Sequence, residues 1–200
     1  MGVSLSKGGN VSLTEQAPNL TAVTVGLGWQ ARTRSPVANG ADFDLDASAL
    51  LVDARGRVPS DRHFVFFNNL KSPEGSVTHM GDELVGGSGG GGADGDQEEI
   101  MVDLAALPPE VDRVVFAVSI YDADARRQSF GQVTRAFIRV IDQADGGELA
   151  RYDLTEDASS DAAMVFGELY RHAAEWRFRA VGQGYASGLR GIAADHGVTV

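Results

Sequence analysis

The chain contains no cysteine, and this absence excludes several kinds of chemistry at once. Disulfide bonds, thiolate zinc sites, iron–sulfur clusters and thiol-based redox catalysis all require cysteine side chains. Histidine is scarce as well, and the four histidines show neither the H-x₃-H nor the H-E-x-x-H spacing of zinc sites. We therefore expect no zinc site, and we interpret His63, His79, His172 and His196 as surface or packing residues.

Long apolar runs and an excess of positive charge are also missing. No run of about 18 apolar residues is available to span a bilayer, so no integral membrane segment is expected. Residues 1–7 lack the apolar core of a secretory signal, and the predicted compartment is the cytoplasm. The formal net charge of −11 opposes attraction to nucleic acid and to anionic membranes. Cations are the partners that this charge favours.

The sequence does contain enough apolar material for a substantial core. Of its 200 residues, 43% are hydrophobic and 22% are charged, which is typical of an ordinary globular protein. This length lies at the upper end of the usual single-domain range, and we predict one domain over residues 1–200. A glycine-rich run begins at Gly86, and we interpret residues 86–95 as a flexible loop within that domain.

Much of the chain shows the period-two alternation of apolar and polar residues that is typical of half-buried strands. Val23, Val25, Leu27 and Trp29 give a clear example. The predicted strands are 11–13, 22–29, 47–53, 63–67, 77–80, 98–104, 113–121, 136–141, 149–154 and 176–181. Many short strands with few helices favour a mainly β fold, a β-sandwich of two packed sheets with one or two short helices.

The clearest predicted helix follows Ser160, which is a suitable N-cap residue. Asp161 is favourable in the first turn of a helix because its charge complements the helix dipole. The apolar residues that then repeat at helical spacing are Ala162, Val165, Phe166 and Leu169. The sequence therefore predicts an amphipathic helix that ends near Arg171.

The most distinctive stretch is Asp42-Phe43-Asp44-Leu45-Asp46, in which carboxylates alternate with apolar side chains. Successive side chains of an extended chain point to opposite faces, so Phe43 and Leu45 can enter a core while the three aspartates share the other side. Such like charges repel one another unless a cation binds there, although a solvated strand edge is the simpler interpretation. Asp46 fits an orientation towards the core equally well. Oxygen-bearing side chains recur downstream, and these are the ligands that calcium and magnesium prefer.

Few features of the sequence point to an enzyme. No G-x-S-x-G nucleophile motif is present, and no G-K-[ST] closes the glycine run as a phosphate-binding loop would. Paired carboxylates are the remaining catalytic option, with Asp44 and either Asp96 or Glu98 as the pair. The sequence therefore favours a protein without catalytic activity.

Nine short motifs, in order along nearly the whole chain, resemble the tellurium-resistance TerD family. They are 25–29 (VGLGW), 42–49 (DFDLDASA), 67–70 (FNNL), 95–98 (GDQE), 130–133 (FGQV), 136–140 (AFIRV), 150–154 (ARYDL), 166–171 (FGELYR) and 181–185 (VGQGY). The resemblance implies a β-sandwich that binds two calcium ions at one end and acts in bacterial stress response and tellurite resistance, without a known enzymatic reaction. It also implies protein partners in a stress-response complex.

The resemblance also assigns oxygen donors to positions of this chain. Its motif positions imply that the calcium ligands are Asp42, Asp44, Asn68, Asn69, Asp82, Asp96 and Glu98, with Asp94 and Asp122 as weaker candidates. Two positions depart from the family pattern, because Gln30 and Gln97 stand where the family usually has aspartate. Each change removes a negative charge, so we expect one of the two calcium sites to be weakened.

Two classes of function remain open from the sequence. The leading one is a calcium-binding, non-catalytic stress-response protein. The alternative is a metal-dependent hydrolase or transferase that uses the same acidic residues. The two differ in the metal site, because catalysis needs an open coordination position that a structural or regulatory site does not.

Overall fold

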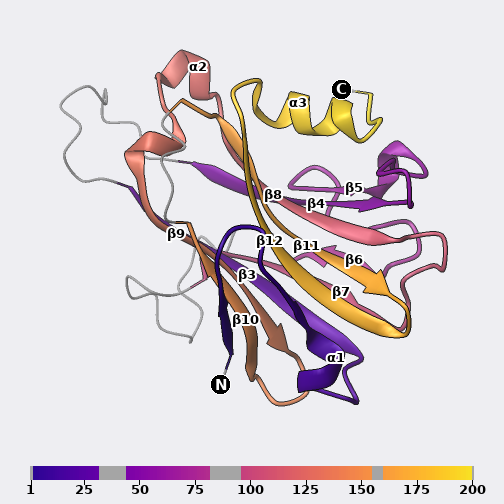
Figure 1. Cartoon of the computed structure of the whole chain (residues 1–200). Coiled ribbons are helices and arrows are strands. Elements are labelled where there is room, and N and C mark those ends of the chain that lie inside the picture. The colour runs from indigo at the N-terminus through magenta and orange to yellow at the C-terminus, as the bar shows by residue number, and fades with distance from the viewer. Residues whose placement is uncertain (1, 32–43, 82–95, 155–159, 200) are drawn as a thin grey trace.

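The structure, a computed structural model, describes residues 2–31, 44–81, 96–154 and 160–199. In these parts of the chain the strands form two six-stranded sheets that pack against each other (Figure 1). The spatial order is β1-β10-β9-β3-β7-β6 in the first sheet and β2-β12-β11-β8-β4-β5 in the second sheet. The predicted mainly β fold of two packed sheets is confirmed.

The bounds of the elements follow the order of each sheet. The first sheet contains β1 (Val3–Leu5), β10 (Glu148–Asp153), β9 (Val133–Asp142), β3 (Ala22–Ala31), β7 (Glu98–Asp103) and β6 (Val77–His79). The second sheet contains β2 (Asn10–Ser12), β12 (Glu175–Tyr185), β11 (Ala163–His172), β8 (Arg113–Ile120), β4 (Leu45–Val52) and β5 (Phe64–Val65). The helices are α1 (Leu13–Gln16), α2 (Ala123–Arg126) and α3 (Gly188–Asp195), and the 3-10 helices are η1 (Asp61–His63) and η2 (Phe130–Gln132).

The main core lies between the two sheets and follows from strand alternation. Val23, Val25 and Leu27 of β3 are fully buried there, as the period-two pattern predicts. Phe116 and Val118 of β8 enter the same core from the second sheet. Burying such side chains stabilises the fold by about 1.5–3 kcal/mol each.

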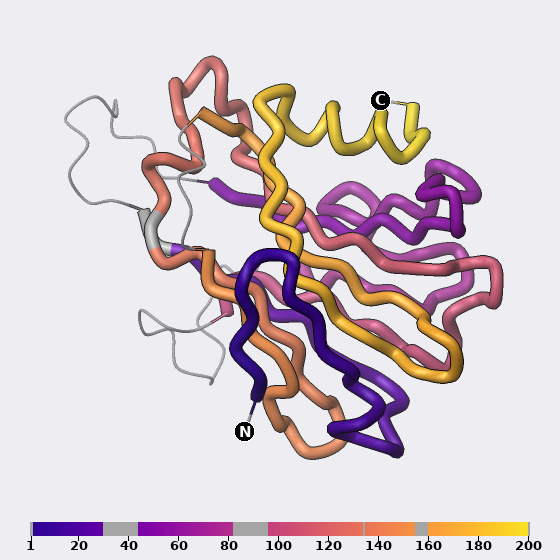
Figure 2. The backbone as a smooth tube through the Cα atoms, in the orientation of Figure 1, coloured from indigo at the N-terminus to yellow at the C-terminus, as the bar shows by residue number. Residues whose placement is uncertain are grey.

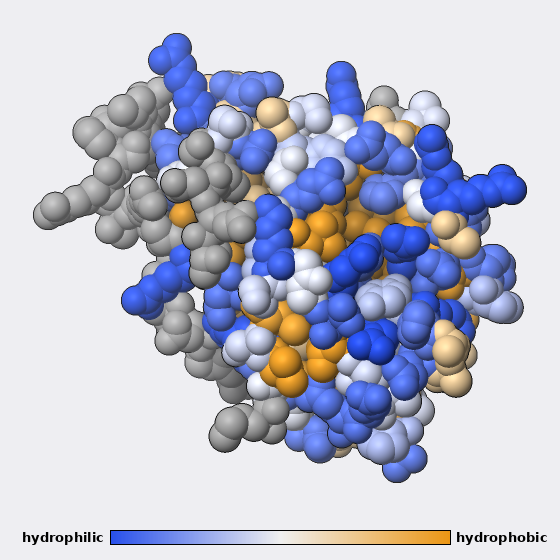
Figure 3. All heavy atoms as spheres, viewed as in Figure 1, coloured by the Kyte–Doolittle hydropathy of each residue, from blue (hydrophilic) through white to orange (hydrophobic). Residues whose placement is uncertain are grey.

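A second apolar cluster covers part of the outer face of the second sheet. Leu50, Val115 and Ala117 lie on this face, and Ile192 and Ala193 of α3 pack against them. The helix is the yellow one that lies above the sheets in Figure 1. On the face seen in Figure 3, apolar residues form separate patches among hydrophilic ones. The second sheet is thus buried on both sides where α3 crosses it.

The N-terminal segment pairs with both sheets. Val3 of β1 is paired in parallel with Ala150 of β10, at the edge of the first sheet. Val11 of β2 is paired with Phe178 of β12, at the edge of the second sheet. Gly8, with φ of 80°, allows the turn between the two strands. Figure 2 shows this indigo segment rising from the N-terminus and then turning back.

One prediction about local structure is wrong. The helix expected after Ser160 is strand β11, which pairs with both β8 and β12. A register shift between Val165 and Gly167 interrupts the period-two alternation of β11, and both Phe166 and Leu169 enter the main core. Apolar residues at helical spacing result from this irregularity. Three short helices are described where one or two were expected, and α3 was not predicted from the sequence.

No helix among the described residues combines the length and the apolar character needed to cross a membrane.

Candidate functional site

Two acidic positions of the predicted site come together where β4 begins and β8 ends. Leu45 is paired with Ile120 in the sheet, and the Tyr121 N–H donates to the Asp44 carbonyl oxygen at 2.9 Å. Asp44 and Asp122, which are far apart in the sequence, therefore lie at the same end of the sandwich. Both residues are exposed. The resemblance implied both residues as calcium ligands, with Asp122 as the weaker candidate.

The backbone beside Asp122 is unusual. Asp122, Arg127 and Arg135 have φ values of 51°, 53° and 52°, in the left-handed region that non-glycine residues rarely adopt. Asp122 and Arg127 flank α2, and Arg135 lies near the start of β9. A left-handed backbone conformation costs energy in a non-glycine residue and persists only where the surrounding structure holds it. Such residues are concentrated at functional sites.

Asp96, another predicted ligand, lies on the outer face of the first sheet and is bound by Arg139 of β9. The guanidinium makes three contacts: Nε lies 2.8 Å from Oδ1 and 3.1 Å from Oδ2, and Nη2 lies 2.9 Å from Oδ2. Only 4% of the Asp96 side-chain surface is exposed. The carboxylate is thus almost buried under an arginine that covers both of its oxygens.

Gly26 of β3 provides the floor on which Asp96 lies. In the sheet Gly26 is paired with Arg139 on one side and Glu99 on the other. A Cβ atom added at Gly26 would be 2.2 Å from Asp96 Oδ2, which is closer than any real contact. Only glycine at this position allows the carboxylate to approach the strand so closely.

Glu98, two residues further on, points into the space between the sheets and is 5% exposed. Its Oε2 accepts a hydrogen bond of 2.6 Å from the Ala47 N–H of β4. The neighbouring strand β5 pairs only with Ala49 and Leu50, so it does not reach Ala47. Glu98 therefore satisfies a backbone donor that has no strand beside it.

His79 of β6 completes this arrangement. Its Nδ1 accepts from the Gly81 N–H at 3.0 Å, which leaves the ring proton on Nε2. That Nε2 lies 3.1 Å from the Ala47 carbonyl oxygen and 3.3 Å from Glu98 Oε2. A neutral histidine and a glutamate from the first sheet thus bind both backbone polar groups of one residue in the second sheet.

The other predicted positions are placed as follows. The Asn69 side-chain amide donates to the carbonyl oxygens of Phe64 and Arg62, at 2.6 and 3.0 Å, and so holds its own turn. Asn68 is exposed in the same turn. Gln97, at a family aspartate position, accepts a hydrogen bond of 2.8 Å from the Trp29 N–H. Three further predicted ligands lie outside the described residues: Asp42, Asp82 and Asp94. The predicted loop 86–95 lies there too.

Within the described ranges, no group of three or more acidic or histidine side chains is gathered closely enough to hold a metal ion. The chemistry of the donors nevertheless fits a hard cation such as calcium, because they are carboxylate oxygens. Asp96 is moreover already bound by a cation, the Arg139 guanidinium, which shows that its position suits positive charge.

Sequence reasoning missed Arg139, Gly26 and His79. A glycine within a strand can indicate close approach of another group, so Gly26 carried a usable signal. Arg139 gave none, because it is an ordinary polar residue of an alternating strand and its partner is remote in the sequence. His79 could not be recognised because its role depends on where β5 stops.

Comparison with known proteins shows the family of this chain. The TerD domain model matches residues 1–196. The chain is 57% identical over 198 residues to tellurium resistance protein TerD of Serratia marcescens, covering 99% of this chain and 98% of that protein. It is 46% identical over 200 residues to general stress protein 16U of Bacillus subtilis (strain 168), covering 100% of both. A crystal structure of a TerD homologue from Streptomyces coelicolor A3(2) matches with a TM-score of 0.65 and 26% identity, covering 88% of this chain and 96% of that one.

Proposed function

Because the chain belongs to the TerD domain family, which includes tellurium resistance and general stress proteins, we propose that it is a calcium-binding stress-response protein without catalytic activity. It binds up to two calcium ions through acidic residues at one end of the sandwich, and one site is weakened. The observation that carries this proposal is that Asp44 and Asp122 lie at the same end of the sandwich, beside the junction of β4 and β8.

The electrostatics of the chain support a cation as the ligand. The formal net charge is −11, so cations are attracted to the molecule as a whole. At the proposed end, Asp44 and Asp122 are exposed and can exchange water for a metal without a large desolvation cost. Carboxylates of this kind are suited to calcium, which accepts six to eight oxygen ligands in flexible geometry.

The proposed role is binding rather than catalysis. The sequence has no cysteine and no G-x-S-x-G motif, so it offers neither a cysteine nucleophile nor a serine nucleophile in that motif. Calcium bound at this end would change the charge of a surface that a partner of a stress-response complex could recognise. We also propose that residues 1–200 act as one domain and that the protein works in the cytoplasm.

Calorimetric titration of chelator-treated protein with calcium and with magnesium tests the proposal. We expect saturable calcium binding, and Asp44→Asn should weaken it about tenfold because it removes one charged ligand while keeping the shape of the side chain. Glu110→Gln is the matched control. It also removes one exposed negative charge, but from the connection between β7 and β8, at the opposite end of β8 from Asp44. Calcium binding that is absent, or equally weakened by both substitutions, would contradict the proposal.

A further inference from the structure

The bond between Arg139 and Asp96 is more than a surface ion pair. Exposed pairs contribute little because water competes for both charges. Here Asp96 is 4% exposed and Arg139 is 27% exposed, and the guanidinium covers both oxygens of the carboxylate. A bidentate contact in this setting is among the stronger polar interactions available to a protein.

Arg139 always carries its positive charge, because a guanidinium stays protonated in proteins. The hydrogen bonds to Asp96 raise the pKa of Arg139 further above its ordinary value, and the charge of Glu148 adds to the effect despite partial burial. A carboxylate whose two oxygens both accept from this group has little capacity left for a metal ion.

We propose that Arg139 is a resident cation that calcium must displace from Asp96, so that this arginine lowers the calcium affinity of the site. The inference rests on the proposed function, since it takes Asp96 to be one of the calcium ligands. Arg139 thus has a positioning role, because it controls whether the Asp96 carboxylate can bind calcium. Calcium and Arg139 compete for this carboxylate, so calcium binds it only at the cost of the Arg139 contact.

The structure also contains a place for the displaced guanidinium. Glu148 of β10 lies on the other side of Arg139, with its Oε2 3.6 Å from Nη1. Arg139 can therefore leave Asp96 and remain paired with a carboxylate, which avoids leaving a charge unpaired. Glu148 thus favours the release of Asp96.

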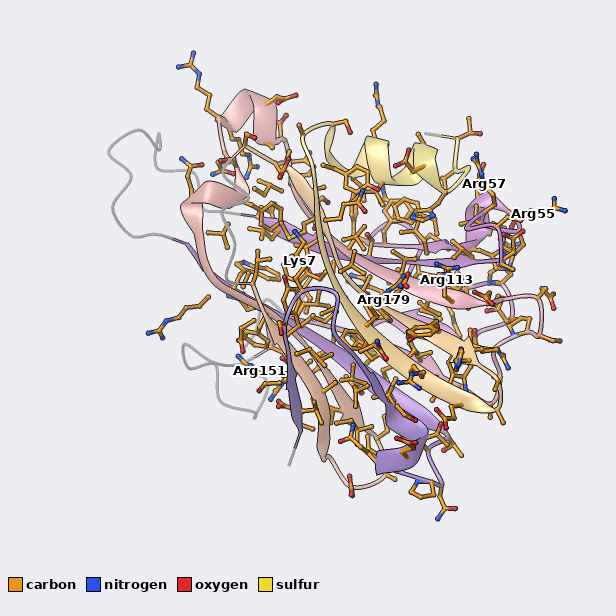
Figure 4. The ribbon with its side chains drawn as sticks, in the orientation of Figure 1. Lys7, Arg55, Arg57, Arg113, Arg151 and Arg179 are labelled. Atoms are coloured by element: carbon orange, nitrogen blue, oxygen red, sulfur yellow. The ribbon has the colours of Figure 1, made fainter. Side chains whose placement is uncertain are left out.

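A matched pair of substitutions tests this competition. Arg139→Gln removes the competing charge, and Arg151→Gln removes the same charge from the residue directly paired with Arg139 in the sheet. Arg151, labelled in Figure 4, lies on β10 and is bonded to Asp153 rather than to Asp96. We expect Arg139→Gln to lower the calcium Kd about tenfold, the size of one charged hydrogen-bond contact. Arg151→Gln should change the Kd less than about twofold, because the Arg151 guanidinium is paired with Asp153 and does not compete for Asp96.

The outcomes separate this inference from the proposed function. If the unmodified protein binds calcium and Arg139→Gln binds it no more tightly, the competition is refuted and Asp96 serves as an anchor for the strand. If neither the unmodified protein nor either variant binds calcium, both proposals fail. If both arginine variants tighten binding equally, net charge explains the change and the competition is again refuted.

A spectroscopic measurement and two further variants keep the test decisive if Arg139→Gln folds poorly. In the unmodified protein, the Arg139 Nε–Hε resonance should shift as calcium saturates the site, and the Arg151 resonance should not. Arg139→Lys keeps the charge but loses the fork, so it should bind calcium more tightly than the parent. Glu148→Gln removes the alternative acceptor and should weaken binding. An unshifted Arg139 resonance at calcium saturation would overturn the proposal.

Discussion

Asp96 and Glu98 are two residues apart, yet they lie on opposite sides of the first sheet and have different kinds of partner. Asp96 rests on Gly26 at the outer face and is bound by a charged guanidinium. Glu98 lies between the sheets and is bound by a backbone N–H and a histidine that is neutral in this tautomer. A turn of the chain at Gln97, which bonds to Leu27 and Trp29 of β3, separates the two carboxylates.

The difference shows how a partner decides what a carboxylate can do. A carboxylate that faces arginine has its charge cancelled, and its availability to another cation depends on that arginine. A carboxylate held by backbone and a neutral ring replaces missing main-chain partners, so its removal leaves a buried donor without an acceptor. We therefore expect Glu98 to control folding and Asp96 to control ligand binding.

The largest expected effect comes from removing the carboxylate of Glu98. Glu98→Ala leaves the buried Ala47 N–H without its acceptor and should lower the free energy of unfolding by about 3 kcal/mol. Urea unfolding measures this change. Glu110→Ala, at an exposed position, is the control and should change the value by less than about 0.5 kcal/mol. Equal midpoints for the two variants would show that Glu98 has no structural role.

Calcium is expected to bind at Asp96 and to stabilise the folded protein. A ligand that binds only the native state raises the free energy of unfolding by roughly 2.7 kcal/mol at a hundredfold excess over its Kd. Asp96→Asn should reduce this gain. Glu98→Gln tests whether Glu98 is also a ligand, because in that case it reduces the gain as well. Thermal unfolding with and without calcium provides the measurement. An equal gain with magnesium would indicate general screening of the net charge of −11 instead.

Gly26→Ala should separate Asp96 from Arg139. The added Cβ would be 2.2 Å from Asp96 Oδ2, so the carboxylate must move and the protein should lose about 2 kcal/mol of stability. The three nearest atoms to that Cβ all belong to Asp96. The same substitution should therefore cost much less in an Asp96→Ala background, which a double-mutant cycle measures. Equal costs in both backgrounds would show that the strand itself, and not Asp96, requires glycine.

The smallest effect is expected at Asp44, which neither sheet encloses. Asp44→Asn should change the free energy of unfolding of the calcium-free protein by less than about 0.5 kcal/mol, because the side chain is exposed. Chemical unfolding in the presence of a chelator measures this. A loss as large as that of Glu98→Ala would mean that Asp44 also supports the fold, and the contrast between exposed and enclosed carboxylates would not hold.

The fold was largely predictable because strand alternation reports which side chains face a core. The alternation of Val23, Val25 and Leu27 with polar or small residues predicted β3 directly. The prediction failed at β11, where the irregularity next to Gly167 places Phe166 and Leu169 on one side and makes a strand look helical. α3 was missed because only Ile192 and Ala193 are buried in it, which is too little apolar periodicity to detect.

The candidate site was less predictable than the fold. Asp44, Asp96 and Glu98 were recognised as oxygen donors, but periodicity does not reveal which group each one meets. The contact of Asp96 with Arg139 depends on the pairing of β3 with β9, and the contact of Glu98 with Ala47 depends on where β5 ends. Both are properties of strand pairing across long sequence separations, which one sequence does not contain.

The pairing of β1 and β2 has a consequence for how the protein is made on the ribosome. These strands are synthesised first, but their partners in the sheets, around Ala150 and Phe178, are synthesised near the end of the chain. At roughly 5–20 residues per second, the first strands wait on the order of ten seconds before either partner exists. Neither sheet can acquire its final edge during translation of the first half of the message. The two sheets are therefore completed late in synthesis, and we expect a slow final folding step that pairs strands far apart in the sequence.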